Sequence, residues 1–257
     1  MTSLCGIVFP GGALIYSDLQ ATSERSRRSS ASETKIYQVG DERVLLAGTG
    51  SIEGIIIGKE RAGEEIRKWK SLHGLRPIPP SEVGEILRQV MTPEDEAYFV
   101  LAAYDPETDQ AEIAEVGDSG VAWPHGLVQV LGSGKVYMHS PALKLEEQIL
   151  ARMKSHIVST AQKYDALPKL KFPKEVAMIA GLEIINCGPA SDVFSGGLGY
   201  QLMTLTKEGV QQYLIPRDEA QKLLAGKWEA EFAAINPQLQ HRRFKEHLEK
   251  FEPWRVK

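Results

Sequence analysis

The order of its secondary-structure signals constrains most strongly what this chain can fold into. Residues 3–9 form a strand-like pattern, the turn signal Pro10-Gly11-Gly12 follows, and a second strand-like pattern occupies 13–18, which predicts a hairpin. The same arrangement of two strand patterns around a short turn-forming segment recurs. Further hairpins are expected at 35–39 with 43–47, at 97–104 with 110–116, and at 199–206 with 210–215. Because hairpins join the strands, the sheets should be largely antiparallel.

Helical patterns separate these groups of strands. Ser51 is a favoured N-cap residue at the start of the first of them, and one more strand, near 127–131, precedes the second pair of helices. The expected helices span 51–72, 81–90, 141–163 and 174–187, the last ending before Gly188-Pro189. An order of strands, two helices, strands, two helices and strands predicts an α+β fold. Helix pairs would cover two antiparallel sheets in a four-layer αββα sandwich.

The chain has 257 residues, which is enough to bury a large core. The strand and helix pattern ends near residue 217, and the remaining residues are charged and helix-prone. We therefore expect one domain at 2–217 and a helical C-terminal extension at 218–257. Residues 20–34 are rich in Ser, Arg and Glu without periodicity, which indicates a solvated loop.

Composition argues against several classes of protein. The net charge of −4 and sequence pI of about 5.9 disfavour a nucleic-acid partner. No apolar run approaches the length of a membrane span, and the N-terminus lacks the basic segment of a signal peptide, so a cytoplasmic protein is expected. Cys5 and Cys187 are too few for a disulfide framework, and the six histidines lie at no ligand spacing. We expect neither a metal nor another cofactor.

A threonine directly follows the initiator methionine. Once Met1 is removed, the Thr2 hydroxyl and the α-amine lie on one residue, so a nucleophile and a base occur together. The α-amine has a pKa of about 7.7–8.0 and can accept a proton at neutral pH, where a lysine amine cannot. Many proteins begin with Met-Thr, so an ordinary N-terminal strand is the alternative. Whether Thr2 is a nucleophile therefore depends on the residues that surround it.

The segment from Thr2 to Ser51 resembles the start of a proteasome β-type subunit, a family that includes the bacterial peptidase working with a ring ATPase. In that family an acidic residue lies sixteen positions after the N-terminal threonine, and a lysine opens the next strand. Asp18 and Lys35 occupy these positions here. Further matches occur in order over about 2–216: Ala47-Gly48-Thr49-Gly50, Gly132-Ser133-Gly134, Asp192-Val193-Phe194-Ser195-Gly196-Gly197 and Thr206-Lys207-Glu208-Gly209.

This resemblance implies a role for each matched residue. The Thr2 hydroxyl would attack the scissile carbonyl and form an acyl-enzyme ester, which water hydrolyses. The Lys35 ammonium would lower the pKa of that hydroxyl, and Asp18 would hold the ammonium in place. The side chains of a second group of residues would form hydrogen bonds with one another and with the Thr2 amine. Its members are Ser133, Asp192 and Ser195.

The substrate site follows from the same resemblance. The backbone N–H of Gly48 would donate to the oxyanion, and Ala21, Leu46 and Gly50 would line the substrate pocket. Leu46 at the base of the pocket favours small to medium apolar side chains before the cleaved bond.

The function implied is a threonine-type endopeptidase subunit of a self-compartmentalised, proteasome-like protease. Such subunits form homo-oligomeric rings that act on unfolded proteins or peptides, and whether an ATPase unfoldase feeds the ring is left open. Two other functions fit the same residues. One is a non-catalytic scaffold subunit, which a retained Met1 would favour. The other is an N-terminal nucleophile amidohydrolase or transpeptidase that acts on small amides.

Overall fold

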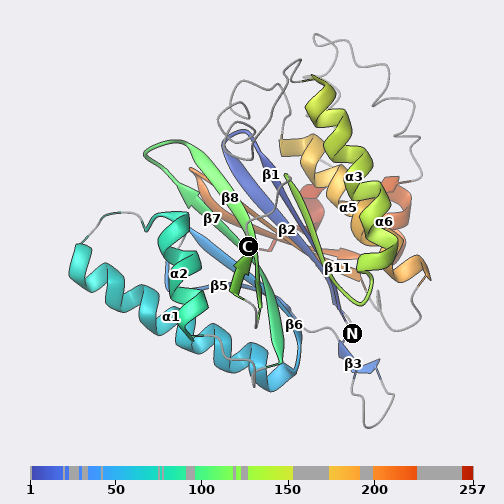
Figure 1. Cartoon of the computed structure of the whole chain (residues 1–257). Helices are drawn as coiled ribbons and strands as arrows, with labels where there is room; N and C mark the ends of the chain where they lie inside the picture. Colours follow the sequence, from blue (N-terminus) through green and yellow to red (C-terminus); the bar gives the residue numbers. More distant parts are fainter. Residues whose placement is uncertain are drawn as a thin grey trace.

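Two five-stranded antiparallel sheets form the centre of the computed structural model of the protein (Figure 1). The structure describes residues 2–19, 21–22, 29–30, 34–41, 43–74, 76, 78–90, 96–117, 120–122, 127–152, 174–191, 199–224 and 251–256.

The first sheet has the strand order β10-β1-β2-β11-β12. Its strands are β1 (Ser3–Phe9), β2 (Gly12–Asp18), β10 (Val128–Gly132), β11 (Gly199–Thr206) and β12 (Gly209–Pro216). Strands β1 and β2 are buried along their whole length, because helices cover one face of this sheet and the second sheet covers the other. The N-terminal strand is therefore internal to the sheet, with β10 and β2 as its two neighbours.

The second sheet has the order β5-β6-β7-β8-β9. Its strands are β5 (Ile36–Gln38), β6 (Val44–Gly50), β7 (Ala97–Asp105), β8 (Gln110–Gly117) and β9 (Gly120–Ala122). The predicted hairpins are all present, whereas β9 was not predicted. A small ladder also joins β3 (Ala21–Thr22) to β4 (Ser29–Ser30) within the segment predicted to be loop.

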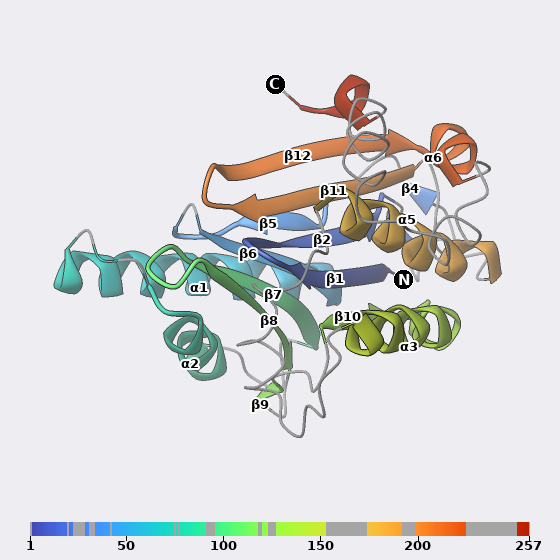
Figure 2. The ribbon, with the colours of Figure 1, turned by 90° about the horizontal axis from the view of Figure 1, so that it is seen from above.

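Helices cover the outer faces of both sheets, as Figure 2 shows. Helices α1 (Ile52–His73) and α2 (Pro80–Val90) pack on the second sheet, and α3 (Lys135–Arg152) and α5 (Lys174–Ser191) pack on the first. Ser51 caps α1 as predicted, since its hydroxyl accepts the N–H of Gly54 at 3.3 Å. The predicted α+β sandwich is thus confirmed. Within the described residues, no helix has the length and apolar composition needed to cross a membrane.

Two helix boundaries differ from the prediction. Helix α3 begins at Lys135, not at 141, because the Gly134 carbonyl accepts the N–H groups of Tyr137 and Met138 and so closes the first turn; Pro141 lies inside this helix. Helix α5 does not end at 187 but continues through Pro189 to Ser191. A proline in the last turn removes only a terminal backbone hydrogen bond, which a helix end tolerates. Residues 153–163 of the predicted third helix lie outside the described residues.

The described parts of the C-terminal region pack against the domain. Helix α6 (Arg217–Leu224) contacts β11, β12 and α5. Residues 251–256 return to the edge strand β12, where the Val256 N–H donates to the Gln212 carbonyl at 2.8 Å. Phe251 is 2% exposed and meets the Tyr213 ring edge-on, with 6.4 Å between the ring centroids. The chain therefore covers the free edge of β12 with its own C-terminal residues.

We predict that Phe251→Ala destabilises the protein by about 3 kcal/mol, because it removes a large side chain from the core. The matched control is Leu72→Ala, a truncation at a side chain that is 80% exposed, which should change stability by less than about 0.5 kcal/mol. Urea unfolding of both variants measures the difference. If Phe251→Ala and Leu72→Ala had equal free energies of unfolding, the C-terminal segment would not dock on β12.

Candidate active site

Thr2 lies immediately before β1 and is held by the turn that follows β10. Its carbonyl oxygen accepts the N–H of Ser133 at 2.9 Å, and Ser3 pairs with Gly132 in the β1–β10 ladder. Gly132 has φ +93°, and a Cβ at this position would lie 1.9 Å from the Thr2 carbonyl oxygen. Only glycine is compatible with both this backbone conformation and this close approach. Thr2 itself is 7% exposed, so the residue has little freedom.

Asp18 and Lys35 meet beside this residue. Asp18 ends β2, next to β1, and its Oδ2 accepts the backbone N–H of Ser3 at 3.1 Å. Its Oδ1 accepts a hydrogen bond from the Lys35 ammonium, which forms an ion pair with it. Asp18 is fully buried and Lys35 is 7% exposed. Asp18 therefore contacts both Lys35 and the residue that follows Thr2.

This ion pair bridges the two sheets. Asp18 belongs to the first sheet, and Lys35 directly precedes β5 of the second. Removing a carboxylate and an ammonium from water costs several kcal/mol each, and pairing offsets that cost only when the geometry is good. A buried ion pair is consequently weak evidence of a contribution to stability. Its contact with the backbone of the residue that follows Thr2 instead makes it a candidate for a chemical role.

Gln201 belongs to this site, although the sequence analysis missed it. It lies on β11, opposite Ser17 of β2, and is 1% exposed. Its Oε1 accepts the backbone N–H groups of Lys35 at 2.9 Å and Ile36 at 3.1 Å, and its Nε2 donates to the Ile36 carbonyl at 3.1 Å. One signal could have identified it, namely a polar amide between Tyr200 and Leu202 inside a strand that is buried along its whole length.

The oxyanion role of Gly48 stays a prediction. In this structure its N–H donates to the carbonyl of Lys35, the residue before β5, at 3.2 Å, so this contact occupies the group that was expected to bind the oxyanion. A Cβ at Gly48 would lie 2.7 Å from Cγ2 of Ile55. The packing of α1 on β6 therefore explains why glycine occurs here.

The predicted pocket residues lie in different surroundings. Leu46 is 1% exposed and belongs to the apolar cluster beneath α1 and α2, so it contributes to the core and not to an open surface. Gly50 is exposed at the end of β6. Ala21 lies in β3, where the structure describes the backbone alone. The substrate contacts of these three residues stay predictions.

The predicted network around the Thr2 amine is described only at Ser133, an exposed residue whose N–H binds the Thr2 carbonyl. Asp192 and Ser195 lie outside the described residues. The roles of these three side chains therefore stay predictions as well.

The two cysteines do not provide a competing nucleophile at neutral pH. Cys5 is fully buried within β1, and burial raises the pKa of its thiol well above the usual value. Burial also raises the pKa of the Cys187 thiol, and the charge of Glu183 adds to this effect. Because the thiolate is the reactive form, both thiols are poor nucleophiles.

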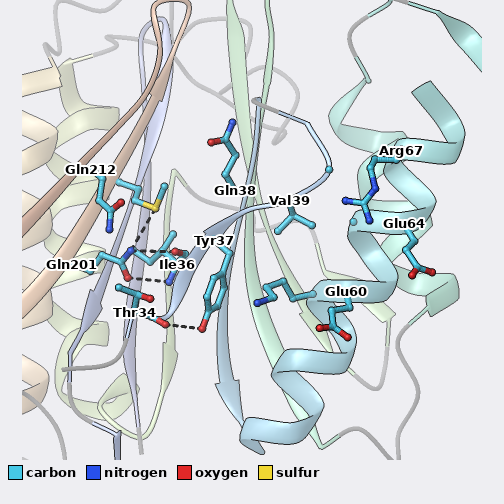
Figure 3. Close-up of a pocket in the computed structure, with 14 residues that line it drawn as sticks. Thr34, Ile36, Tyr37, Gln38, Val39, Glu60, Glu64, Arg67, Gln201 and Gln212 are labelled. Atoms are coloured by element: carbon cyan, nitrogen blue, oxygen red, sulfur yellow. Dashed lines mark hydrogen bonds between the residues drawn. The ribbon is translucent and has the colours of Figure 1, made fainter. Parts of the chain in front are cut away.

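A cavity of about 520 Å³ adjoins the segment that carries Lys35 (Figure 3). It lies between β5, α1 and the β11–β12 hairpin, and Thr34 and Gln201 line it near the ion pair. Charged side chains of α1 line the opposite wall, among them Lys59, which lies 4.4 Å from the centroid of the Tyr37 ring. Thr2, Asp18 and Lys35 are not among the residues that line this cavity, so it lies beside the site.

Comparison with known proteins identifies a family for most of this structure. A family model described as proteasome subunit matches residues 2–149, which include β1, β2, β5 and β6 together with the Asp18–Lys35 pair. No curated protein matches the chain.

We predict that Gly132→Ala is much more destabilising than Gly209→Ala. Both glycines have positive φ, but a Cβ at Gly209 would meet nothing within 4 Å, whereas one at Gly132 would overlap the Thr2 carbonyl. Gly209→Ala should therefore cost only the backbone strain of about 1–2 kcal/mol. Gly132→Ala should cost more, because the backbone of Thr2 or Gly132 must move. Urea unfolding compares the two, and equal costs would rule out the close approach at Thr2.

Proposed function

The chain belongs to the proteasome subunit family, and on this premise we propose that it is a threonine-type endopeptidase subunit with Thr2 as its nucleophile. The nucleophile forms when Met1 is removed. The observation that supports this proposal most directly is the Asp18 carboxylate, which accepts both the N–H of Ser3 and the Lys35 ammonium. One buried carboxylate thus binds both the backbone next to Thr2 and the Lys35 ammonium.

In the proposed reaction the Thr2 α-amine accepts the hydroxyl proton while Oγ forms a bond to the carbonyl carbon of the substrate. The peptide C–N bond then breaks, and the leaving amine takes that proton. Water attacks the resulting ester, restores the Thr2 hydroxyl and releases the carboxylic acid product. The Lys35 ammonium, held by Asp18, stabilises the negative charge that develops on the oxygen atoms.

Membership of this family implies assembly into an oligomeric ring. We propose rings of identical subunits that enclose the Thr2 sites and admit unfolded proteins or peptides, with an ATPase unfoldase as an optional partner. Exposed apolar side chains on the described helices support such contacts. Among them are Ile52 and Ile56 on α1, and Val136 and Leu143 on α3.

Intact-mass spectrometry with a threonine-directed epoxyketone or β-lactone tests the nucleophile. We expect the mass of the chain without Met1, and one adduct per chain after treatment. Thr2→Ala should abolish the adduct, whereas the control Cys187→Ser should retain it, because burial raises the pKa of the Cys187 thiol and so disfavours its reactive thiolate.

A chain that keeps Met1 and forms no adduct would contradict the proposal and favour a scaffold subunit. If the adduct forms, an unfolded protein substrate separates the remaining functions. Cleavage of that substrate is expected of an endopeptidase. Hydrolysis of small amides alone would indicate an amidohydrolase.

A second prediction separates the chemical role of the ion pair from its effect on stability. Asp18→Asn and Lys35→Met each leave one buried charge without its partner, so each should destabilise the protein by about 3–5 kcal/mol. The double variant removes both charges and should recover much of this loss. Labelling of Thr2 should nevertheless fall on the order of 10²–10⁴-fold in all three variants. Urea unfolding and labelling rates measure the two effects, and normal labelling of the double variant would falsify a catalytic role.

A further inference from the structure

We propose that Gln201 is a positioning residue that sets where the Lys35 ammonium lies relative to Asp18. The inference rests on the proposed function, in which that ammonium acts beside Thr2. Gln201 lies outside residues 2–149, the part of the chain that the family model matches.

The amide of Gln201 acts as a short piece of neighbouring strand. Strand β5 is the edge of its sheet, so among the described residues the N–H and carbonyl of Ile36 that point away from β6 would otherwise have no backbone partner. Gln201 supplies both, since its Oε1 accepts the Ile36 N–H and its Nε2 donates to the Ile36 carbonyl (Figure 3). The orientation of the amide is determined, because a flipped amide would direct its NH₂ group at two N–H donors.

The same amide holds Lys35 itself. Its Oε1 accepts the Lys35 N–H at 2.9 Å, while the Lys35 carbonyl accepts the N–H of Gly48 at 3.2 Å. Both backbone groups of the lysine are therefore fixed: the first sheet holds the N–H through Gln201, and the second sheet holds the carbonyl through Gly48. The direction in which its side chain leaves the backbone follows from these two bonds.

Gln201 is also fixed relative to Asp18. In the β2–β11 ladder Gln201 pairs with Ser17, and its neighbour Tyr200 pairs with Asp18. No ladder joins β2 to β5, since these strands belong to different sheets. The backbone ladder thus sets Gln201 relative to Asp18, and the Gln201 amide sets Lys35 relative to Gln201. Because a displacement of about 1 Å can reduce a rate about 10²-fold, this link matters for the chemistry.

Three variants test the proposal in the full-length chain. Gln201→Met keeps the length of the side chain but removes the acceptor and the donor. Gln201→Glu keeps an acceptor oxygen for the N–H groups of Lys35 and Ile36, but when ionised it loses the donor and adds a negative charge at a buried position. Gln212→Met is the control, because Gln212 lines the same cavity from the neighbouring strand β12.

We expect kcat, calculated per Thr2 site that the probe can label, to fall about 10- to 100-fold in Gln201→Met with little change in KM. Gln201→Glu should retain more activity, and Gln212→Met should match the wild type. The pH profile of Thr2 labelling should shift in Gln201→Met. A loss of stability alone would reduce the folded fraction without altering the kcat or the pH profile of the molecules that remain folded.

Crystal structures of the wild type and the Gln201 variants provide a readout that does not depend on activity. Separation of the Lys35 ammonium from Asp18 in Gln201→Met supports the proposal, and an unchanged ion pair overturns it. Wild-type kinetics and pH profile in the folded Gln201→Met variant would overturn it as well. If the wild type forms no Thr2 adduct, the proposed function fails, whereas the structures still decide whether Gln201 positions Lys35. If Gln201→Met does not fold, the structure of Gln201→Glu decides in the same way. A Lys35 backbone that stays in place without a hydrogen bond to residue 201 excludes a positioning role. A Lys35 backbone that is still bound to the retained oxygen of residue 201 supports it.

Discussion

The buried ion pair between Lys35 and Asp18 joins the two sheets at the end of the molecule where the chain begins. Two charges can be buried there only because further groups hold each partner in place. The Ser3 N–H binds the carboxylate, and Gln201 and Gly48 bind the backbone of the lysine. Each of these bonds comes from a different part of the chain. The position of the Lys35 ammonium is therefore a property of the whole sandwich and not of one motif.

Thr2 is held by its place next to an internal strand. Because β10 and β2 pair with β1 on both sides, Thr2 cannot move independently of the first sheet. Gly132 approaches the Thr2 carbonyl too closely for any side chain, and the N–H of Ser133 binds that carbonyl. In the proposed reaction, a Thr2 backbone that is fixed before the substrate binds would lose little entropy. This arrangement accounts for the glycine-serine-glycine turn without assigning a chemical role to its serine.

Motif residues and structural roles do not always coincide in this protein. Gly48 matches a family motif, yet its N–H is used within the sheet and its missing side chain makes room for Ile55 of α1. Leu46 occupies the expected position but contributes to the core. Gln201 has no motif around it, and it makes three hydrogen bonds to the segment that carries the lysine. Contacts therefore identify the residues of this site more fully than sequence matches do.

Local patterns in the sequence were sufficient to predict the hairpins, the cap at Ser51 and the α+β sandwich, because turn residues and periodicity act over short distances. Resemblance to a family also indicated that Thr2, Asp18 and Lys35 belong together. The tertiary structure alone decided that Gln201 reaches Lys35, 166 positions away, that α5 continues through Pro189, and that residues 251–256 return to β12. These features depend on which strands lie side by side and on which sheets face each other. Neither periodicity nor residue spacing specifies such long-range pairing.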